Sequence, residues 1–213
     1  MIRSVIIICI AGLLTLPVFA QQKEAKDVLD KTSTNFRKAG GVEAGFTIKI
    51  KAKGQSEGLM VGNIRLKGDK FVLKTTDAIT WFDGETQWSY LTDSEEVNIS
   101  NPTEEELQGI NPYALLSIYE KGFSYTLGKT RTYQGRSIYE VVLTSTDKKK
   151  EMSKLILYVA KDTYQPLYIL AELNNGSRNE ITITNYRGGQ KIDDSIFVFD
   201  KKQYPRAEII DLR

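Results

Sequence analysis

Two acidic clusters hold the residues whose types and spacing are best suited to chemistry. Asp93, Glu95 and Glu96 form the first, and the run Glu104-Glu105-Glu106 forms the second. Paired carboxylates can act as the general acid and base of a glycosidase. Both clusters, however, fall in a turn or in the first turn of an expected helix, where acidic residues are ordinary. A carboxylate-based hydrolase is therefore the less favoured hypothesis.

The other common catalytic and metal-binding patterns are missing from the sequence. The chain has no histidine, which excludes a histidine-based triad, a histidine metal site and a histidine pH switch. It has no Gly-rich phosphate loop, HExxH, CxxC or Gly-x-Ser-x-Gly motif. The formal net charge is +2, and Lys and Arg are scattered rather than gathered into a nucleic-acid-binding stripe. We therefore expect a binding protein, not an enzyme, with no cofactor and no metal.

The best-defined element is a hairpin over residues 79–91. Asp83-Gly84 separates two runs of aromatic and β-branched residues, which predicts a tight primed turn. Trp88 and Tyr90 share one face of the second arm, and Trp81 shares a face with Ile79 on the first. We expect an antiparallel sheet wrapped around this aromatic face.

Alternation of apolar and polar residues from Glu43 onward predicts about eleven short strands joined by tight turns. Such a meander with one apolar face is typical of a sandwich or a barrel. The last two predicted strands cover residues 195–199 and 207–212. The fold class is therefore mainly β with short α-helices.

Two helical segments interrupt this pattern. Residues 22–39 have the apolar spacing of an amphipathic helix, and Gly40-Gly41 ends it. Residues 101–106 have the signature of a helix start, with Glu106 three positions after Thr103. A second short helix over residues 111–122 is apolar on more than one side. It is either a plug that fills one end of the core or a lid over a cavity.

The N-terminus reads as a secretory signal. A short basic region precedes an apolar run over residues 5–16, and Val18-Phe19-Ala20 offers small residues for cleavage after Ala20. The alternative, an uncleaved anchor, is disfavoured because the run is shorter than the roughly 20 residues of a spanning helix. Cys9 lies inside the apolar run, so the mature chain would carry neither a disulfide nor a lipid-bearing thiol. We expect a soluble exported protein with a single domain over residues 21–213.

An ordered set of motifs resembles the periplasmic carriers of outer-membrane lipoproteins of the LolA/LolB type, and the LolA-like branch in particular. An N-terminal helix is followed by the motifs Gly45-Phe46-Thr47, Gly62-Asn63-Ile64, Lys70-Phe71-Val72-Leu73, the Asp83–Tyr90 hairpin, Pro112 with Leu115-Leu116, Phe197-Val198-Phe199 and Asp211. The family carriers commonly have an Arg-Pro pair before the Phe strand, the arginine helping to latch the lid. Lys67-Gly68-Asp69 occupies that place here.

The resemblance implies an unclosed antiparallel β-barrel with an N-terminal helix and a mid-chain helical lid. It also implies a periplasmic carrier that takes acylated lipoproteins from an inner-membrane lipoprotein-releasing transporter to an outer-membrane acceptor, as a monomer. The candidate ligand-binding residues of its hydrophobic cavity are Phe46, Ile48, Met60, Ile64, Phe71, Trp81, Trp88, Tyr90, Leu115 and Leu116. Two further readings stay open: a binder of another lipid or hydrophobic molecule, and a structural envelope domain whose barrel is filled by side chains.

Overall fold

The computed structural model describes residues 16–103, 106–107, 118–120, 122–147 and 149–213. These residues form one long helix, thirteen strands and three 3-10 turns, two strands more than the sequence predicted. The elements are α1 (Leu16–Lys38), β1 (Gly41–Lys51), β2 (Gly58–Lys67), β3 (Lys70–Thr75), β4 (Ala78–Phe82), β5 (Gln87–Leu91), β6 (Glu96–Ser100), η1 (Ile118–Glu120), β7 (Phe123–Leu127), β8 (Arg131–Tyr133), β9 (Arg136–Ser145), β10 (Met152–Ala160), β11 (Pro166–Leu173), β12 (Arg178–Gln190), η2 (Asp194–Phe197), η3 (Lys201–Gln203) and β13 (Glu208–Asp211).

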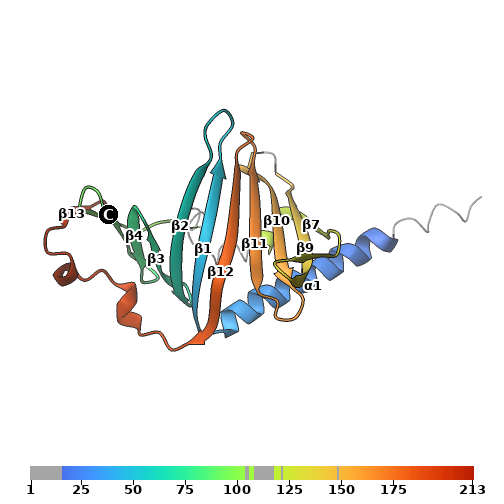
Figure 1. Cartoon of the computed structure of the whole chain (residues 1–213), viewed down its shortest axis with the longest axis horizontal. Helices are drawn as coiled ribbons and strands as arrows, with labels where there is room; N and C mark the ends of the chain where they lie inside the picture. The colour runs from blue at the N-terminus through green and yellow to red at the C-terminus, as the bar shows by residue number, and fades with distance from the viewer. Residues whose placement is uncertain (1–15, 104–105, 108–117, 121, 148) are drawn as a thin grey trace, which may run out of the picture.

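All thirteen strands belong to one curled sheet (Figure 1). Its order is β13-β6-β5-β4-β3-β2-β1-β12-β11-β10-β9-β7, and β8 adds a short pairing to β9. The pairs are antiparallel except for β13, which lies parallel to β6. Because β13 and β7 end the order without pairing to each other, the sheet is an unclosed barrel. The predicted fold class is thus confirmed.

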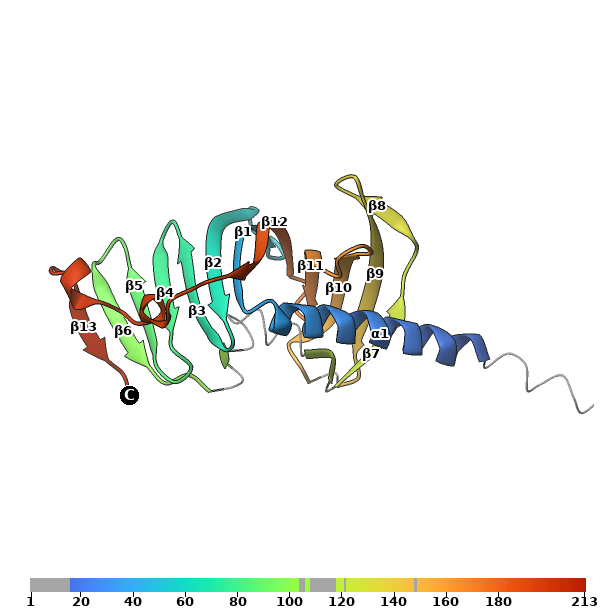
Figure 2. The ribbon, with the colours of Figure 1, turned by 90° about the horizontal axis from the view of Figure 1, so that it is seen from below.

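Helix α1 packs on one face of this sheet, which we call the inner face. Figure 2 shows it crossing the strands of the β7–β11 half. Ala25, Val28 and Leu29 are buried there against β9, β10 and β11, while Phe36 near the helix end joins the cluster on β1–β4. Gly40 follows the helix with a φ of 69°, the left-handed conformation expected of a C-terminal cap. The helix begins at Leu16, earlier than the predicted start at Gln22.

A segment over residues 192–207, which we call the C-terminal strap, covers the opposite, outer face of β3–β6 (Figure 2). The sequence predicted a strand over residues 195–199, and this prediction is wrong. The Asp193 side chain accepts a 2.8 Å hydrogen bond from the Ser195 backbone N–H and starts η2 instead. The ring of Phe197 is then fully buried against Trp81 and Val72.

The central hairpin is confirmed, but its turn differs from the prediction. Residues 83–86 form a four-residue loop between β4 and β5, not a two-residue primed turn. One oxygen of the Asp83 carboxylate accepts hydrogen bonds from the backbone N–H groups of Glu85 (3.0 Å) and Thr86 (2.8 Å). Only Gly84 of the predicted pair has a positive φ, 106°. The carboxylate therefore organises a longer loop than the Asp-Gly pair suggested.

Candidate functional site

An apolar surface runs along the inner face of β1, β2 and β3. Strand register places Phe46 beside Gly62 and Ile48 beside Met60, and places Ile64 beside Leu73. All of these residues except Gly62 belong to one hydrophobic cluster, in which the predicted site residues Phe46, Ile64 and Phe71 are buried. Five predicted site residues are thereby brought together, namely Phe46, Ile48, Met60, Ile64 and Phe71.

Part of this surface is only partly buried. Ile48 and Met60 lie near the turn that joins β1 to β2, and Leu73 and Ile181 flank them on β3 and β12. Ile181 packs on both major clusters and so joins the β1–β4 half of the inner face to the half beneath α1. Leu73 and Ile181 were not among the predicted site residues, although their strand alternation places them on the same face. We call Ile48, Met60, Leu73 and Ile181 the inner apolar surface.

The room on this surface depends on a glycine. A Cβ atom added to Gly62 would collide with the ring of Phe46 and would lie 2.5 Å from the backbone oxygen of Lys74. A real Cβ does not approach a backbone oxygen that closely. Gly62 therefore leaves the room that the Phe46 ring occupies beside β2.

Where the structure describes the residues around it, the interior beneath α1 is packed. A cavity of about 10 Å³ lies between the helix and the sheet, enough for at most about one water molecule. The Thr32 hydroxyl on its wall donates a 2.9 Å hydrogen bond to the Val28 carbonyl, so the wall presents little polar character. Its lining residues are Leu29, Thr32, Tyr119, Leu143, Leu155, Leu157 and Ile169. A long apolar ligand would have to displace α1 to enter here.

Both described ends of the segment between β6 and β7 reach the inner face. The predicted helix start forms a capping box: the Thr103 N–H and hydroxyl donate to the Glu106 carboxylate (2.8 and 2.9 Å), and the Glu106 N–H donates to the Thr103 hydroxyl (3.3 Å). Leu107 packs on the cluster of Phe46. Leu115 and Leu116, and most of the predicted lid over residues 111–122, lie outside the described residues.

At the other end, Tyr119 ties η1 to α1. Its hydroxyl donates a 2.8 Å hydrogen bond to Asp30, which also accepts a 2.6 Å bond from Lys26. Burial of the phenol and its bond to a carboxylate raise the pKa of Tyr119. Partial burial alone would raise the pKa of Asp30, but the hydrogen bonds from Lys26 and Tyr119 hold it below its ordinary value. The carboxylate is therefore charged at neutral pH.

Trp81, Trp88 and Tyr90 do not join this site. Phe71 on the inner face pairs with Phe82, so Trp81, the residue before Phe82 on β4, points to the outer face. Trp88 and Tyr90 lie on that outer face too, because they pair with Trp81 and Ile79. Tyr204 of the strap packs edge-on to Trp81 at 5.5 Å between ring centroids and lies 4.7 Å from Tyr90. Their placement in one cavity with Phe46 and Phe71 is a prediction that the structure corrects. These rings instead pack against the C-terminal strap on the outer face.

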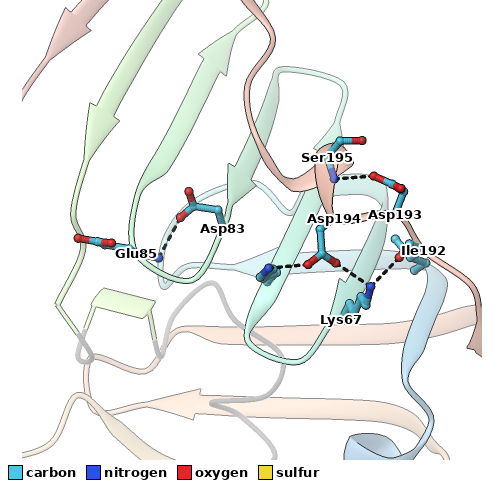
Figure 3. Close-up of polar contacts among 8 residues, drawn as sticks. Lys67, Asp83, Glu85, Ile192, Asp193, Asp194 and Ser195 are labelled. Carbon is cyan, nitrogen blue, oxygen red and sulfur yellow. Dashed lines mark hydrogen bonds and ion pairs between the residues drawn. The ribbon is translucent and has the colours of Figure 1, made fainter.

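Lys67, in the Lys67-Gly68-Asp69 stretch at the end of β2, also binds the strap. Lys67 Nζ donates to the Ile192 carbonyl oxygen at 2.8 Å and to Asp194 at 2.6 Å (Figure 3). Lys70 Nζ donates to the other oxygen of Asp194 at 2.9 Å. These two ammonium groups lower the pKa of Asp194 to about 2. Lys67 thus fastens the C-terminal segment to the β2–β3 turn.

One described member of each acidic cluster considered for catalysis has a structural partner. Glu95 pairs with Arg206 of the strap at 2.6 Å and has a φ of 56°. Glu106 serves in the capping box with Thr103, and Glu104 and Glu105 lie outside the described residues. In the part of the chain that the structure describes, no cluster of acidic or cysteine residues is arranged to hold a metal ion.

The inner face turns polar on β5 and β6, which sequence analysis missed. Gln87, Ser89, Asn98 and Ser100 lie there because they alternate with the outward-facing rings of β5 and the buried aliphatic residues of β6. The Gln87 side chain donates a 3.3 Å hydrogen bond to the Ser89 hydroxyl. The inner apolar surface therefore ends at β3 and β4, and the same alternation that revealed the aromatic hairpin marks that boundary.

No helix among the described residues is long and apolar enough to cross a membrane. A search of curated proteins found no match. Among solved structures, an uncharacterized conserved protein from Thermus thermophilus aligns with a TM-score of 0.61 at 12% identity, covering 88% of this chain and 99% of that chain. A putative outer membrane lipoprotein-sorting protein domain from Vibrio parahaemolyticus aligns with a TM-score of 0.50 at 11% identity, covering 87% of this chain and 100% of that chain.

At these identities the two structures show a shared fold. A family model carries the stronger result, because it matches residues 16–176, which is more than half of the sequence. That stretch includes α1, the five site residues on the inner face and the central hairpin. The chain therefore belongs to the family described as outer membrane lipoprotein carrier protein LolA.

Proposed function

We propose that the protein is a periplasmic carrier that shields the acyl chains of lipoproteins and shuttles them from the inner to the outer membrane. The inner apolar surface supports this proposal most directly. It is partly exposed, apolar, and continuous at Ile181 with the core beneath α1. Phe46, Ile64 and Phe71 form its floor, and Ile48, Met60, Leu73 and Ile181 contact the ligand.

The physical need for such a surface is large. Each methylene group exposed to water costs roughly 0.8 kcal/mol, so one long acyl chain costs on the order of 10 kcal/mol. A lipoprotein does not cross an aqueous space unaided at that cost. The packed cavity of about 10 Å³ beneath α1 does not hold such a chain, so the cargo binds first along β1, β2 and β3 and extends toward α1 only as the helix moves.

The cellular route follows from the same proposal. A signal peptide is cleaved after Ala20, and residues 21–213 act as one exported domain in the periplasm. An inner-membrane lipoprotein-releasing transporter supplies the energy for loading, since the sequence carries no nucleotide-binding motif, and an outer-membrane acceptor takes the cargo. N-terminal sequencing of the exported protein should begin at Gln21; a product that keeps Met1 and fractionates with membranes contradicts the cleavage.

A second candidate, a structural envelope domain, is favoured by one observation. The space between α1 and the described strands is filled by side chains, as expected of a domain that binds nothing. The two functions differ in their response to cargo. A mass spectrum of lipid extracted from the purified protein, together with binding of a dansyl-labelled palmitoylated peptide and of its unacylated form, separates them. The carrier binds the acylated peptide alone, whereas the structural domain binds neither peptide and yields no lipid.

A further inference from the structure

Strand β2 has a free backbone edge over part of its length. On one side it pairs with β1 from Gly58 to Lys67, whereas β3 pairs with its other side only from Gly62 onward. Among the residues that the structure describes, no strand lies beside residues 58–61 on the β3 side. The unpaired N–H and C=O groups of such an edge are a template for another extended chain.

The side chains on this stretch are exposed and apolar. Leu59 and Val61 are 67% and 54% exposed, among the most exposed large hydrophobic residues of the described chain. They alternate with Met60, so they point to the outer face, away from the inner apolar surface. A single extended chain could cover these two side chains and also form hydrogen bonds with the free backbone edge.

The surroundings are basic. Lys49 lies directly across from Leu59. Lys51 and Lys53 follow Lys49 toward the turn between β1 and β2, Lys74 on β3 lies across from Asn63, and all four lysines are exposed. No ion pair joins any of these lysines to another described residue. Three carboxylates, Glu57, Asp77 and Glu180, share this region with the four lysines, and Glu180 lies directly across from Lys49, so the lysines outnumber the acids by one.

The hairpin is also accessible. Figure 1 shows the turn between β1 and β2 rising above β3 and β4. The open place beside residues 58–61 lies where β3 would continue beyond Thr75. A partner can therefore approach this edge without moving a described strand.

From these features we propose that residues 58–61 of β2 capture an extended, acidic polypeptide segment by strand addition. An extended backbone satisfies the edge groups, the apolar side chains of the segment cover Leu59 and Val61, and its carboxylates meet the lysines. A lipid surface fits less well, because unpaired backbone groups are costly in an apolar phase. The inference is independent of acyl-chain binding, which uses the opposite face of the same strands.

The experiment uses the mature full-length protein and a fluorescein-labelled nine-residue peptide in which glutamate alternates with valine and threonine. Fluorescence anisotropy should show saturable binding that weakens as salt is added. The same peptide N-methylated at alternate amides should not bind, because it lacks the donors for strand pairing. Amide hydrogen exchange at residues 58–61 should slow on binding.

Variants locate the contact. Lys49→Glu combined with Lys74→Glu should weaken binding about tenfold or more, and Leu59→Ser combined with Val61→Ser should do the same. Ile209→Ser is the matched control, because Ile209 is a similarly exposed residue (46%) on the edge strand β13. It should leave binding unchanged. All these positions are exposed, and an unchanged melting temperature confirms that each variant folds.

Three results would overturn the proposal. The first is equal binding of the N-methylated and unmethylated peptides, which would show that binding does not depend on backbone hydrogen bonds to β2. The second is absence of peptide binding together with binding to phosphatidylglycerol vesicles that Leu59→Ser abolishes, which makes the site a membrane contact. The third is sedimentation of the protein as a dimer, and of the Leu59→Ser, Val61→Ser variant as a monomer. This result would show that the edge binds a second copy of the chain.

Discussion

The hydroxyl of Tyr119 donates a 2.8 Å hydrogen bond to the carboxylate of Asp30, joining the end of the segment between β6 and β7 to helix α1. The Tyr119 side chain is 5% exposed, and the two residues are 89 positions apart in the chain. This contact joins helix α1 to the segment between β6 and β7, two parts of the chain that are far apart in the sequence.

Tyr119→Phe should lower the free energy of unfolding by about 1–2 kcal/mol, because the ring is kept and a hydrogen bond to a charged group is lost. Tyr125→Phe is the control, since Tyr125 contacts Tyr119 edge-on but its hydroxyl forms no hydrogen bond of this kind to another residue that the structure describes. Urea unfolding measures both variants. A cost for Tyr119→Phe no larger than that for Tyr125→Phe would mean that the bond does not fasten the segment.

Gly62→Ala should destabilise the protein by about 1–3 kcal/mol, because the added methyl group meets the Phe46 ring and a backbone oxygen that cannot move away. Gly58→Ala, on the same strand, should have a small effect, since its Cβ would lie 3.6 Å from its nearest neighbour, an ordinary contact. Thermal unfolding of the two variants makes the comparison. Equal costs would show that close packing on the inner face is not the cause.

The strap should loosen in acid. Lys67 and Lys70 lower the pKa of Asp194 to about 2 in the folded protein, whereas an unfolded aspartate titrates near 4. The contribution of Asp194 to stability is therefore complete above about pH 4 and is lost as the pH falls from about 4 to about 2. Trp81 and Trp88, which lie under the strap, should report this loss as a change in fluorescence over that range.

Asp194→Asn should reduce that fluorescence change. The matched control is Asp211→Asn, because Arg213 lowers the pKa of Asp211 to about 2 as well, so that this residue titrates over the same range. If Asp211→Asn reduces the fluorescence change as much as Asp194→Asn does, the change does not come from the contact between Asp194 and the two lysines, and the prediction is wrong.

Because both tryptophans lie on the outer face, acylated cargo should change their emission little.

Alternation and turn residues were sufficient to predict much of the sheet. The period of two from Glu43 places Phe46, Ile48, Met60 and Ile64 on one face, because adjacent antiparallel strands keep their faces in register. The capping box of Thr103 and Glu106 was likewise predictable, since it depends on residues three positions apart. Local spacing thus predicted these features.

What local spacing did not predict was which face of the hairpin meets which part of the chain. Alternation put Trp81, Trp88 and Tyr90 on one face, but only the pairing of Phe71 with Phe82 shows that this face is the outer one. A strap from the other end of the chain then buries it. Residues 195–199 were misassigned for a related reason, because the Asp193 side chain, and not alternation, determines the local backbone.

The central claim is that acyl chains bind the inner apolar surface. Ile48 and Thr47 are neighbours on β1 that point to opposite faces, and neither is fully buried. The most direct measurement is the dissociation constant of the dansyl-labelled palmitoylated peptide for Ile48→Asp and Thr47→Asp, each checked by its melting temperature. The carrier model predicts an increase of at least about tenfold, or roughly 1.4 kcal/mol, for Ile48→Asp and a change within about twofold for Thr47→Asp. Equal effects of the two variants, or unchanged binding to folded Ile48→Asp, would contradict it.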